Sequence, residues 1–178
     1  MKHLASKIFL IFGLWCLVLS SMFFLERYQP SAKQNTVSLA DTNTFSVNPN
    51  AKPARMIIKS INVDLPIVPS QMKNWNWEMT DRGVSYLVSS PIPSQTGNSI
   101  LYGHNFPALL GGLPRVKPGE KITIVFSDKS YKTFTIGYTA VVSPDQIHIL
   151  DASKDKRITI YTCTGLFDEK RFVAVAFL

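Results

Sequence analysis

Short runs of hydrophobic and β-branched residues, separated by turn-forming residues, fill the chain from residue 55 to residue 178. Residues 121–126 carry apolar side chains at the even positions, which is the period of a strand buried on one face. Residues 131–142 form a longer strand-like run, in which Gly137 is a candidate β-bulge. The pattern predicts about eight short strands drawn from residues 56–61, 65–68, 71–80, 83–87, 99–102, 121–126, 131–142, 157–164 and 171–178, with residues 65–68 as an edge strand because of Pro66.

Little of this region has a helical period. Only residues 106–113 and 146–150 are predicted to form short helical turns. Evenly spaced short strands with turn signals predict a mainly β domain, either a sandwich or a closed barrel. The roughly 125 residues involved are enough for a single hydrophobic core.

A different pattern occupies the N-terminus. Residues 8–25 contain no charged residue, and an apolar run of about 18 residues is near the lower limit for a membrane-spanning helix. Basic residues precede the run, so the positive-inside rule predicts a cytoplasmic N-terminus and an extracellular remainder. The alternative is a cleaved signal peptide, but the run is longer than a usual signal core and no convincing small-residue cleavage site follows it.

These patterns divide the chain into three parts. We predict a single-pass membrane anchor at residues 1–27, a flexible linker at 28–54 and a β domain at 55–178. The linker is rich in Asn, Ser, Thr, Pro and Ala and has no sustained apolar period. The expected location is the cell membrane, with the β domain outside the cell.

The charge of the chain adds little to these predictions of fold and location. The formal net charge is +7, but the lysines and arginines are scattered. Scattered basic residues fit a solvated surface beside an anionic envelope better than nucleic-acid binding, so no nucleic-acid partner is expected. The acidic residues lack the spacing of a calcium-binding loop. We therefore expect no metal ion and no cofactor.

The candidate chemistry begins with cysteine. The chain has two, Cys16 in the apolar run and Cys163 in the β region, so the exported part cannot form an internal disulfide. Cys163 is either an inert strand cysteine or a reactive thiol. His104 follows a strand-like run and Arg171 opens the last one. Each is unremarkable alone, but a thiol, an imidazole and a fixed positive charge together compose a thiol nucleophile site.

The motifs around these residues resemble the sortase family, the membrane-anchored cysteine transpeptidases of mainly Gram-positive bacteria. Residues 159–163 (TIYTC) resemble its Thr-Leu-x-Thr-Cys signature, with Ile in place of Leu. Gly103-His104 and Arg171 match its histidine and arginine. Smaller likenesses lie at residues 57–67, 97–101, 117–122 and 138–142, so the resemblance covers residues 55–178.

This resemblance implies a closed eight-stranded sortase-type β-barrel. It implies that Cys163 is the nucleophile, His104 the general acid and base, and Arg171 the group that stabilises the oxyanion. Thr162 is expected to shape the oxyanion site or bind substrate, Asn105 to make a local hydrogen bond, and His148 to be structural. The absence of an obvious lid-like extension resembles classes D to F more than the pilin-building class C.

The resemblance also implies the partners. The expected substrates are secreted proteins with a C-terminal LPxTG-like sorting motif, and the expected acceptor is an amine of a cell-wall precursor or a pilin. Two alternatives stay open: a cysteine peptidase that releases its product to water, and a catalytically silent surface-binding barrel.

Overall fold

The computed structural model describes residues 51–73 and 76–178, together with Trp15, Leu17, Leu19 and Ser21. These last four residues are helical, and the three large apolar ones among them are exposed. Within the described part of the chain, no helix has the length and hydropathy needed to span a bilayer. Almost all of the predicted anchor and linker, residues 1–54, lies outside the described residues.

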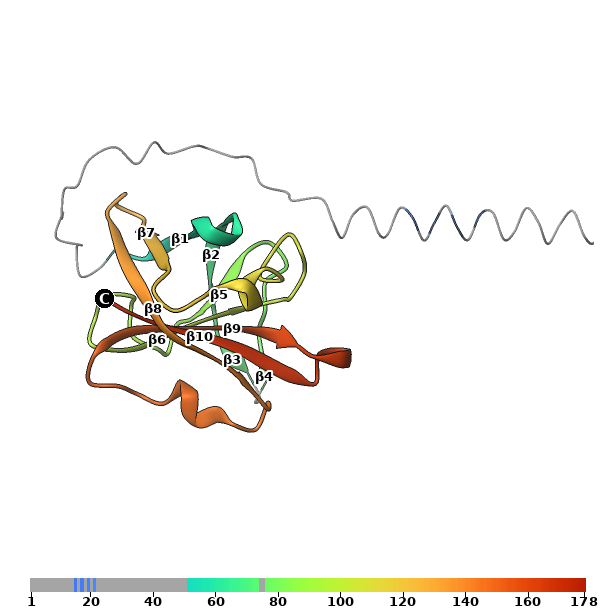
Figure 1. Cartoon of the computed structure of the whole chain (residues 1–178). Coiled ribbons are helices and arrows are strands. Elements are labelled where there is room, and N and C mark those ends of the chain that lie inside the picture. The colour runs from blue at the N-terminus through green and yellow to red at the C-terminus, as the bar shows by residue number, and fades with distance from the viewer. Residues whose placement is uncertain (1–14, 16, 18, 20, 22–50, 74–75) are drawn as a thin grey trace, which may run out of the picture. The chain divides into compact units, whose positions relative to one another are not determined.

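The domain is a closed barrel of eight strands in the order β1-β2-β5-β6-β9-β10-β8-β7 (Figure 1). This strand order confirms the predicted mainly β fold and shows that the domain is a closed barrel and not a sandwich. The barrel strands are β1 (Pro53–Ile58), β2 (Val63–Ser70), β5 (Val84–Leu87), β6 (Gly97–Gly103), β7 (Lys121–Phe126), β8 (Tyr131–Val142), β9 (Lys156–Thr164) and β10 (Lys170–Phe177).

The remaining regular elements are short. Strands β3 (Met72–Lys73) and β4 (Asn76–Trp77) form a separate two-stranded sheet. The 3-10 turns are η1 (Lys59–Ile61), η2 (Leu113–Arg115), η3 (Ile147–Leu150) and η4 (Leu166–Asp168). Turn η3 falls within the helical turn predicted at 146–150, whereas η2 overlaps the one predicted at 106–113 only at Leu113. The predicted strand at 71–80 is replaced by the β3–β4 pair, and Trp75 lies outside the described residues.

Apolar side chains fill the barrel interior. Ile122, Ile124 and Phe126 are buried while their odd-numbered neighbours are not, as the alternation in β7 predicts. A second, smaller cluster lies on the other face of β5 and β6, where Leu87, Ile100 and Tyr102 are buried. The outer face of β5 and β6 therefore carries a small apolar cluster that is separate from the barrel core.

Two details of the barrel differ from the sequence prediction. The strand predicted at 56–61 ends at Ile58, because η1 follows and Asn62 turns the chain with a φ of 56°. The prediction of an edge strand at 65–68 is wrong, because β2 pairs with β1 through residues 63–66 and with β5 through residues 67–70. Each half has a ladder partner on one side, so the missing N–H of Pro66 is tolerated.

The bulge predicted at Gly137 is confirmed. Val175 of β10 pairs with Tyr138 of β8, and the next residue, Ala176, pairs with Ile136, which leaves Gly137 as the extra residue. A Cβ atom at Gly137 would lie 2.5 Å from the ring of Phe177. Only glycine fits this position without displacing that ring.

Candidate active site

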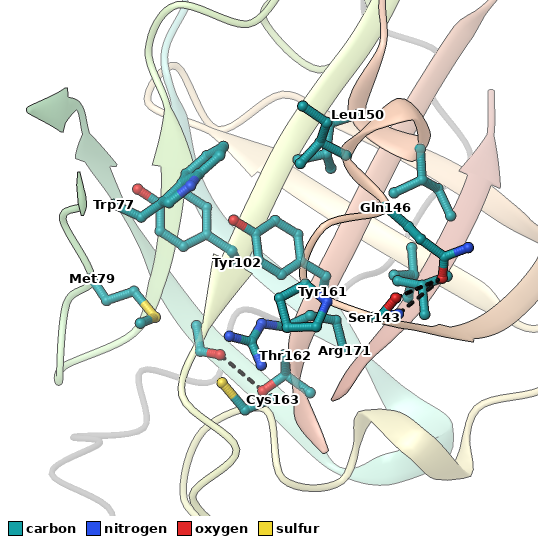
Figure 2. Close-up of a pocket in the computed structure, with 16 residues that line it drawn as sticks. Trp77, Met79, Tyr102, Ser143, Gln146, Leu150, Tyr161, Thr162, Cys163 and Arg171 are labelled. Atoms are coloured by element: carbon teal, nitrogen blue, oxygen red, sulfur yellow. Dashed lines mark hydrogen bonds between the residues drawn. The ribbon is translucent and has the colours of Figure 1, made fainter. Parts of the chain in front are cut away.

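Cys163 and Arg171 lie directly opposite each other on the antiparallel strands β9 and β10. Opposed residues in such a pair present their side chains on the same face, with Cα atoms about 4.5–5.5 Å apart. Both residues are half-buried, and both line one pocket on the outer face of the barrel (Figure 2). The strand register thus places a fixed positive charge beside a thiol.

The guanidinium of Arg171 is held by its own loop. Its Nη1 donates hydrogen bonds to the carbonyl oxygens of Asp168 at 2.8 Å and Lys170 at 2.9 Å. Among the described residues, Nε and Nη2 of Arg171 make no hydrogen bond. Because a guanidinium has five N–H donors and keeps its charge, donors remain for an anionic ligand in the pocket.

Thr162 connects the ends of the two strands that carry the candidate residues. It is 1% exposed, and its Oγ1 donates to the carbonyl oxygen of Gly103 at 2.8 Å across the parallel pair of β6 and β9. A hydroxyl has one proton, so Thr162 cannot donate to an oxyanion while it keeps this bond. The contact is a positioning one, and direct substrate binding by Thr162 stays a prediction.

Removal of the Thr162 hydroxyl should destabilise the barrel. Thr162→Val keeps the side-chain shape but leaves the Gly103 carbonyl without its partner, so we expect a loss of about 1–3 kcal/mol in the free energy of unfolding. Thr162→Ser keeps the hydroxyl and should cost less. Urea unfolding of both variants measures the difference, and a valine variant as stable as the serine one contradicts the assignment.

His104 lies at the end of the strand beside Cys163, but its ring is turned elsewhere. It follows Gly103, which pairs with Thr162, so the chain leaves β6 level with the end of β9. The half-buried imidazole stacks on Phe106 with ring centroids 4.9 Å apart, and it is not among the residues that line the pocket. The structure therefore gathers Cys163, Arg171 and Thr162 in one pocket and leaves the His104 ring against Phe106.

Asn105 links the loop after β6 to the loop between β9 and β10. Its Nδ2 donates to Oδ1 of Asp168 at 2.6 Å, so the predicted local hydrogen bond is in fact a contact between distant segments. Asp168 and its neighbour Phe167 both have positive φ, 61° and 57°. Non-glycine residues rarely adopt this conformation without support from their surroundings. The loop that precedes Arg171 is thus held against the loop that carries His104.

Three aromatic rings form one wall of the pocket. Trp77 packs edge-on against Tyr102 at 5.1 Å and Tyr161 at 5.9 Å, and the two tyrosine rings stack at 5.5 Å (Figure 2). The Tyr102 hydroxyl donates to the carbonyl oxygen of Glu78 at 2.7 Å, which ties the chain after β4 to β6. The sequence analysis missed this wall, although Tyr161 stands two residues before Cys163 in a strand and must therefore share its face.

Ionisation of Tyr161 should destabilise the fold. Burial raises the pKa of Tyr161 well above its ordinary value, with a further increase from the neighbouring Tyr102, and burial also raises the pKa of Tyr102. A raised folded-state pKa means that the unfolded chain loses its phenolic proton first, so the free energy of unfolding falls as the pH rises above about 10. Tyr161→Phe should show a shallower fall between pH 9 and 12 in urea titrations, and equal slopes contradict this expectation.

The pocket has a volume of about 240 Å³ and is mainly apolar. Beside the aromatic wall, it is lined by Met79, Val173 and residues from the segment after β8, and Arg171 is the charged residue in the lining. His148 is exposed on η3 and does not line the pocket. Within the described residues, no three His, Cys, Asp or Glu side chains lie close enough together to hold a metal ion.

The fold and this pocket define a closed β-barrel with a thiol and a guanidinium on adjoining strands of its outer face. The chain belongs to the sortase family, because a family model described as the sortase domain matches residues 56–178. Sortase A of Listeria monocytogenes is 35% identical over 83 residues, which cover 44% of this chain and 37% of that protein. The match thus spans little more than a third of this curated relative's length.

Solved structures show the same fold. The crystal structure of Listeria monocytogenes sortase A is similar with a TM-score of 0.59 and 26% identity, covering 72% of this chain and 88% of that one. A sortase D5 transpeptidase of Clostridium perfringens has a TM-score of 0.61 at 20% identity, with 71% and 78% covered. Sortase C1 of Streptococcus agalactiae has a TM-score of 0.60 at 22% identity, with 71% and 68% covered. These structures carry different class letters, and the last two support the fold alone.

Proposed function

We propose that the protein is a cysteine transpeptidase. It cleaves a C-terminal LPxTG-like sorting motif through a thioacyl intermediate on Cys163 and transfers the acyl group to an amine of a cell-wall precursor or a pilin. The observation that carries the proposal is the register that sets Arg171 opposite Cys163 in one pocket. Membership in the sortase family supports it.

In the first half-reaction, the thiolate of Cys163 attacks the scissile carbonyl carbon, and the carbonyl oxygen takes up negative charge. Arg171 stabilises this oxyanion with its remaining N–H donors and its charge. Collapse of the intermediate breaks the C–N bond, and His104 gives a proton to the leaving amine. A thioester links the acyl group to the sulfur.

In the second half-reaction, the acceptor amine attacks the thioester carbonyl and His104 takes up the amine's proton. The Cys163 thiolate leaves, and a new amide is formed. This scheme requires the His104 ring to leave its stack on Phe106 and to come within hydrogen-bonding reach of the reacting nitrogen. The backbone of His104 directly follows β6, whose last residue, Gly103, pairs with Thr162 of β9.

The pocket supports a peptide substrate with apolar side chains. Its walls are aromatic and aliphatic, and no Asp or Glu of the described part of the chain lines it. The apolar run at residues 8–25 supports anchoring in the cell membrane, with the barrel outside the cell where secreted proteins pass. We propose no nucleic-acid partner, since the basic residues are scattered.

The experiment that tests the function uses the full-length protein and a library of peptides with sorting-motif-like ends. Mass spectrometry follows cleavage with and without several added amines and detects the acyl-enzyme. Formation of amide products whose rate rises with amine concentration supports the proposal. Release to water at a rate that no amine changes indicates a peptidase, and failure of a thiol-reactive probe to label Cys163 indicates a silent barrel.

The two histidines of the barrel provide a matched pair for the acid and base step. His104→Ala should lower kcat about 10²-fold, because general acid–base catalysis contributes at least that much. His148→Ala should leave kcat unchanged, since the imidazole of His148 is exposed on η3 and outside the pocket lining. The kcat of both variants at saturating peptide is the measurement, and equal kcat values remove His104 from the scheme.

A further inference from the structure

The segment between β8 and β9, residues 143–155, lines one side of the pocket but is weakly anchored by its own side chains. Pro144, Ile147, Ile149 and Leu150 contribute to the lining. None of the segment's side chains is buried, and Ile147 is 68% exposed. Figure 2 shows Leu150 and Gln146 on the opposite side of the pocket from Trp77 and Met79. The conformation of this segment therefore sets the shape of the pocket, yet hydrophobic burial alone does not fix it.

A buried amide of the barrel reaches this segment. Asn98, in β6, is 4% exposed, and its Nδ2 donates to the carbonyl oxygens of Ile149 at 3.3 Å and Asp151 at 3.1 Å. These two carbonyls flank Leu150, which packs against the apolar cluster on the outer face of β5 and β6. The amide thus binds the backbone on both sides of a residue that lines the pocket.

A second buried side chain fixes the orientation of the amide. Thr159 of β9 is fully buried, and its Oγ1 lies 2.7 Å from Oδ1 of Asn98. The two backbone carbonyls can only accept, so the NH₂ group of Asn98 must face them and the Thr159 hydroxyl must donate to the amide oxygen. Both N–H donors of the Asn98 side chain are used, and a buried network in which the groups are paired in this way is rigid.

We infer that Asn98, oriented by Thr159, is a positioning residue that holds the β8–β9 segment in the shape that binds the peptide. Asn98 stands five residues before Gly103 in β6, about 17 Å along the strand, so it does not touch the reacting groups. It acts through Ile149 and Leu150 on the pocket wall. The inference deepens the proposed transpeptidase function and rests on it for the role of the pocket.

The first test removes the amide from the full-length protein. In Asn98→Ala, we expect amide hydrogen exchange in residues 147–151 to rise about tenfold or more, because two hydrogen bonds to this backbone are lost. Exchange in β6, β9 and β10 should stay as in the unchanged protein. The KM for the peptide should rise about tenfold while kcat changes less than about twofold, since binding and not chemistry is affected.

A matched pair at Thr159 keeps the test decisive if Asn98→Ala does not fold. Thr159→Val removes the hydroxyl that orients the amide, whereas Thr159→Ser keeps it. Faster exchange of residues 147–151 in the valine variant than in the serine variant supports the inference. Equal exchange in the two variants overturns it, as does unchanged exchange of this segment in folded Asn98→Ala.

The two readouts separate this inference from the proposed function. Hydrogen exchange needs no turnover, so it reports on the segment even if the protein transfers no acyl group. An Asn98→Ala protein with a loosened segment and an unchanged KM overturns the link to the peptide. Absence of turnover in the unchanged protein instead contradicts the transpeptidase proposal, and the exchange result then still decides whether Asn98 holds the segment.

Discussion

Cys163→Ala should abolish acyl transfer, with a loss on the order of 10⁴-fold or more in kcat, because covalent catalysis has no substitute for its nucleophile. The acyl-enzyme should also disappear from mass spectra. The barrel should stay folded, since Cys163 is half-buried at the pocket and outside the main hydrophobic core. Thermal unfolding of the variant checks that the loss is one of chemistry.

The other cysteine is the control for this prediction. Cys16 lies in the N-terminal apolar run, so Cys16→Ala should retain transfer and leave Cys163 as the sole thiol for labelling. A thiol-reactive probe should then bind in a one-to-one ratio and inactivate the protein. Retention of turnover by Cys163→Ala would rule out the nucleophile assignment.

Arg171→Ala should lower kcat about 10³-fold, because removal of an oxyanion-stabilising donor typically costs two to three orders of magnitude. Arg171→Lys keeps the positive charge but loses the planar guanidinium. In the arginine, Nη1 bonds the carbonyl oxygens of Asp168 and Lys170 while the other nitrogens stay available to the pocket. We therefore expect the lysine variant to recover only a small part of the activity. Turnover with the KM measured separately distinguishes this loss from weaker peptide binding.

Lys170 offers the matched control for Arg171. It is exposed, it carries the same charge, and it accepts a hydrogen bond from the arginine through its backbone carbonyl, which a substitution to alanine keeps. Lys170→Ala changes the net charge as Arg171→Ala does and should leave kcat within about twofold, as expected for an exposed surface charge. Equal losses in the two variants mean that overall charge matters and that Arg171 has no specific role.

Local patterns were sufficient to predict much of the barrel. Strands β7 and β8 begin and end where the apolar periods predict, and the bulge at Gly137 follows from a glycine inside a strand. The double pairing of β2 could not be predicted in this way. Its partners β1 and β5 lie on either side of it in the barrel, and the alternation within a strand carries no information about neighbours.

The candidate site, like the barrel, could be predicted from local sequence patterns only in part. Arg171 and Cys163 share a pocket because they belong to strands that are adjacent in both sequence and space. The aromatic wall is different, since Trp77, Tyr102 and Tyr161 come from three distant segments and meet only in the folded barrel. The stacking of His104 on Phe106 depends on the side-chain rotamer of His104, and a sequence pattern does not determine rotamers.

The parallel pairing of β6 with β9 bears on when the proposed active site can form during folding. Residues 97–103 pair with residues 156–162, and contacts between such remote parts of a chain form slowly during folding. Until they form, His104 and Cys163 belong to unconnected stretches of polypeptide. On the proposed mechanism, a newly made chain therefore keeps Cys163 apart from His104, and we expect the proposed activity only after the barrel closes.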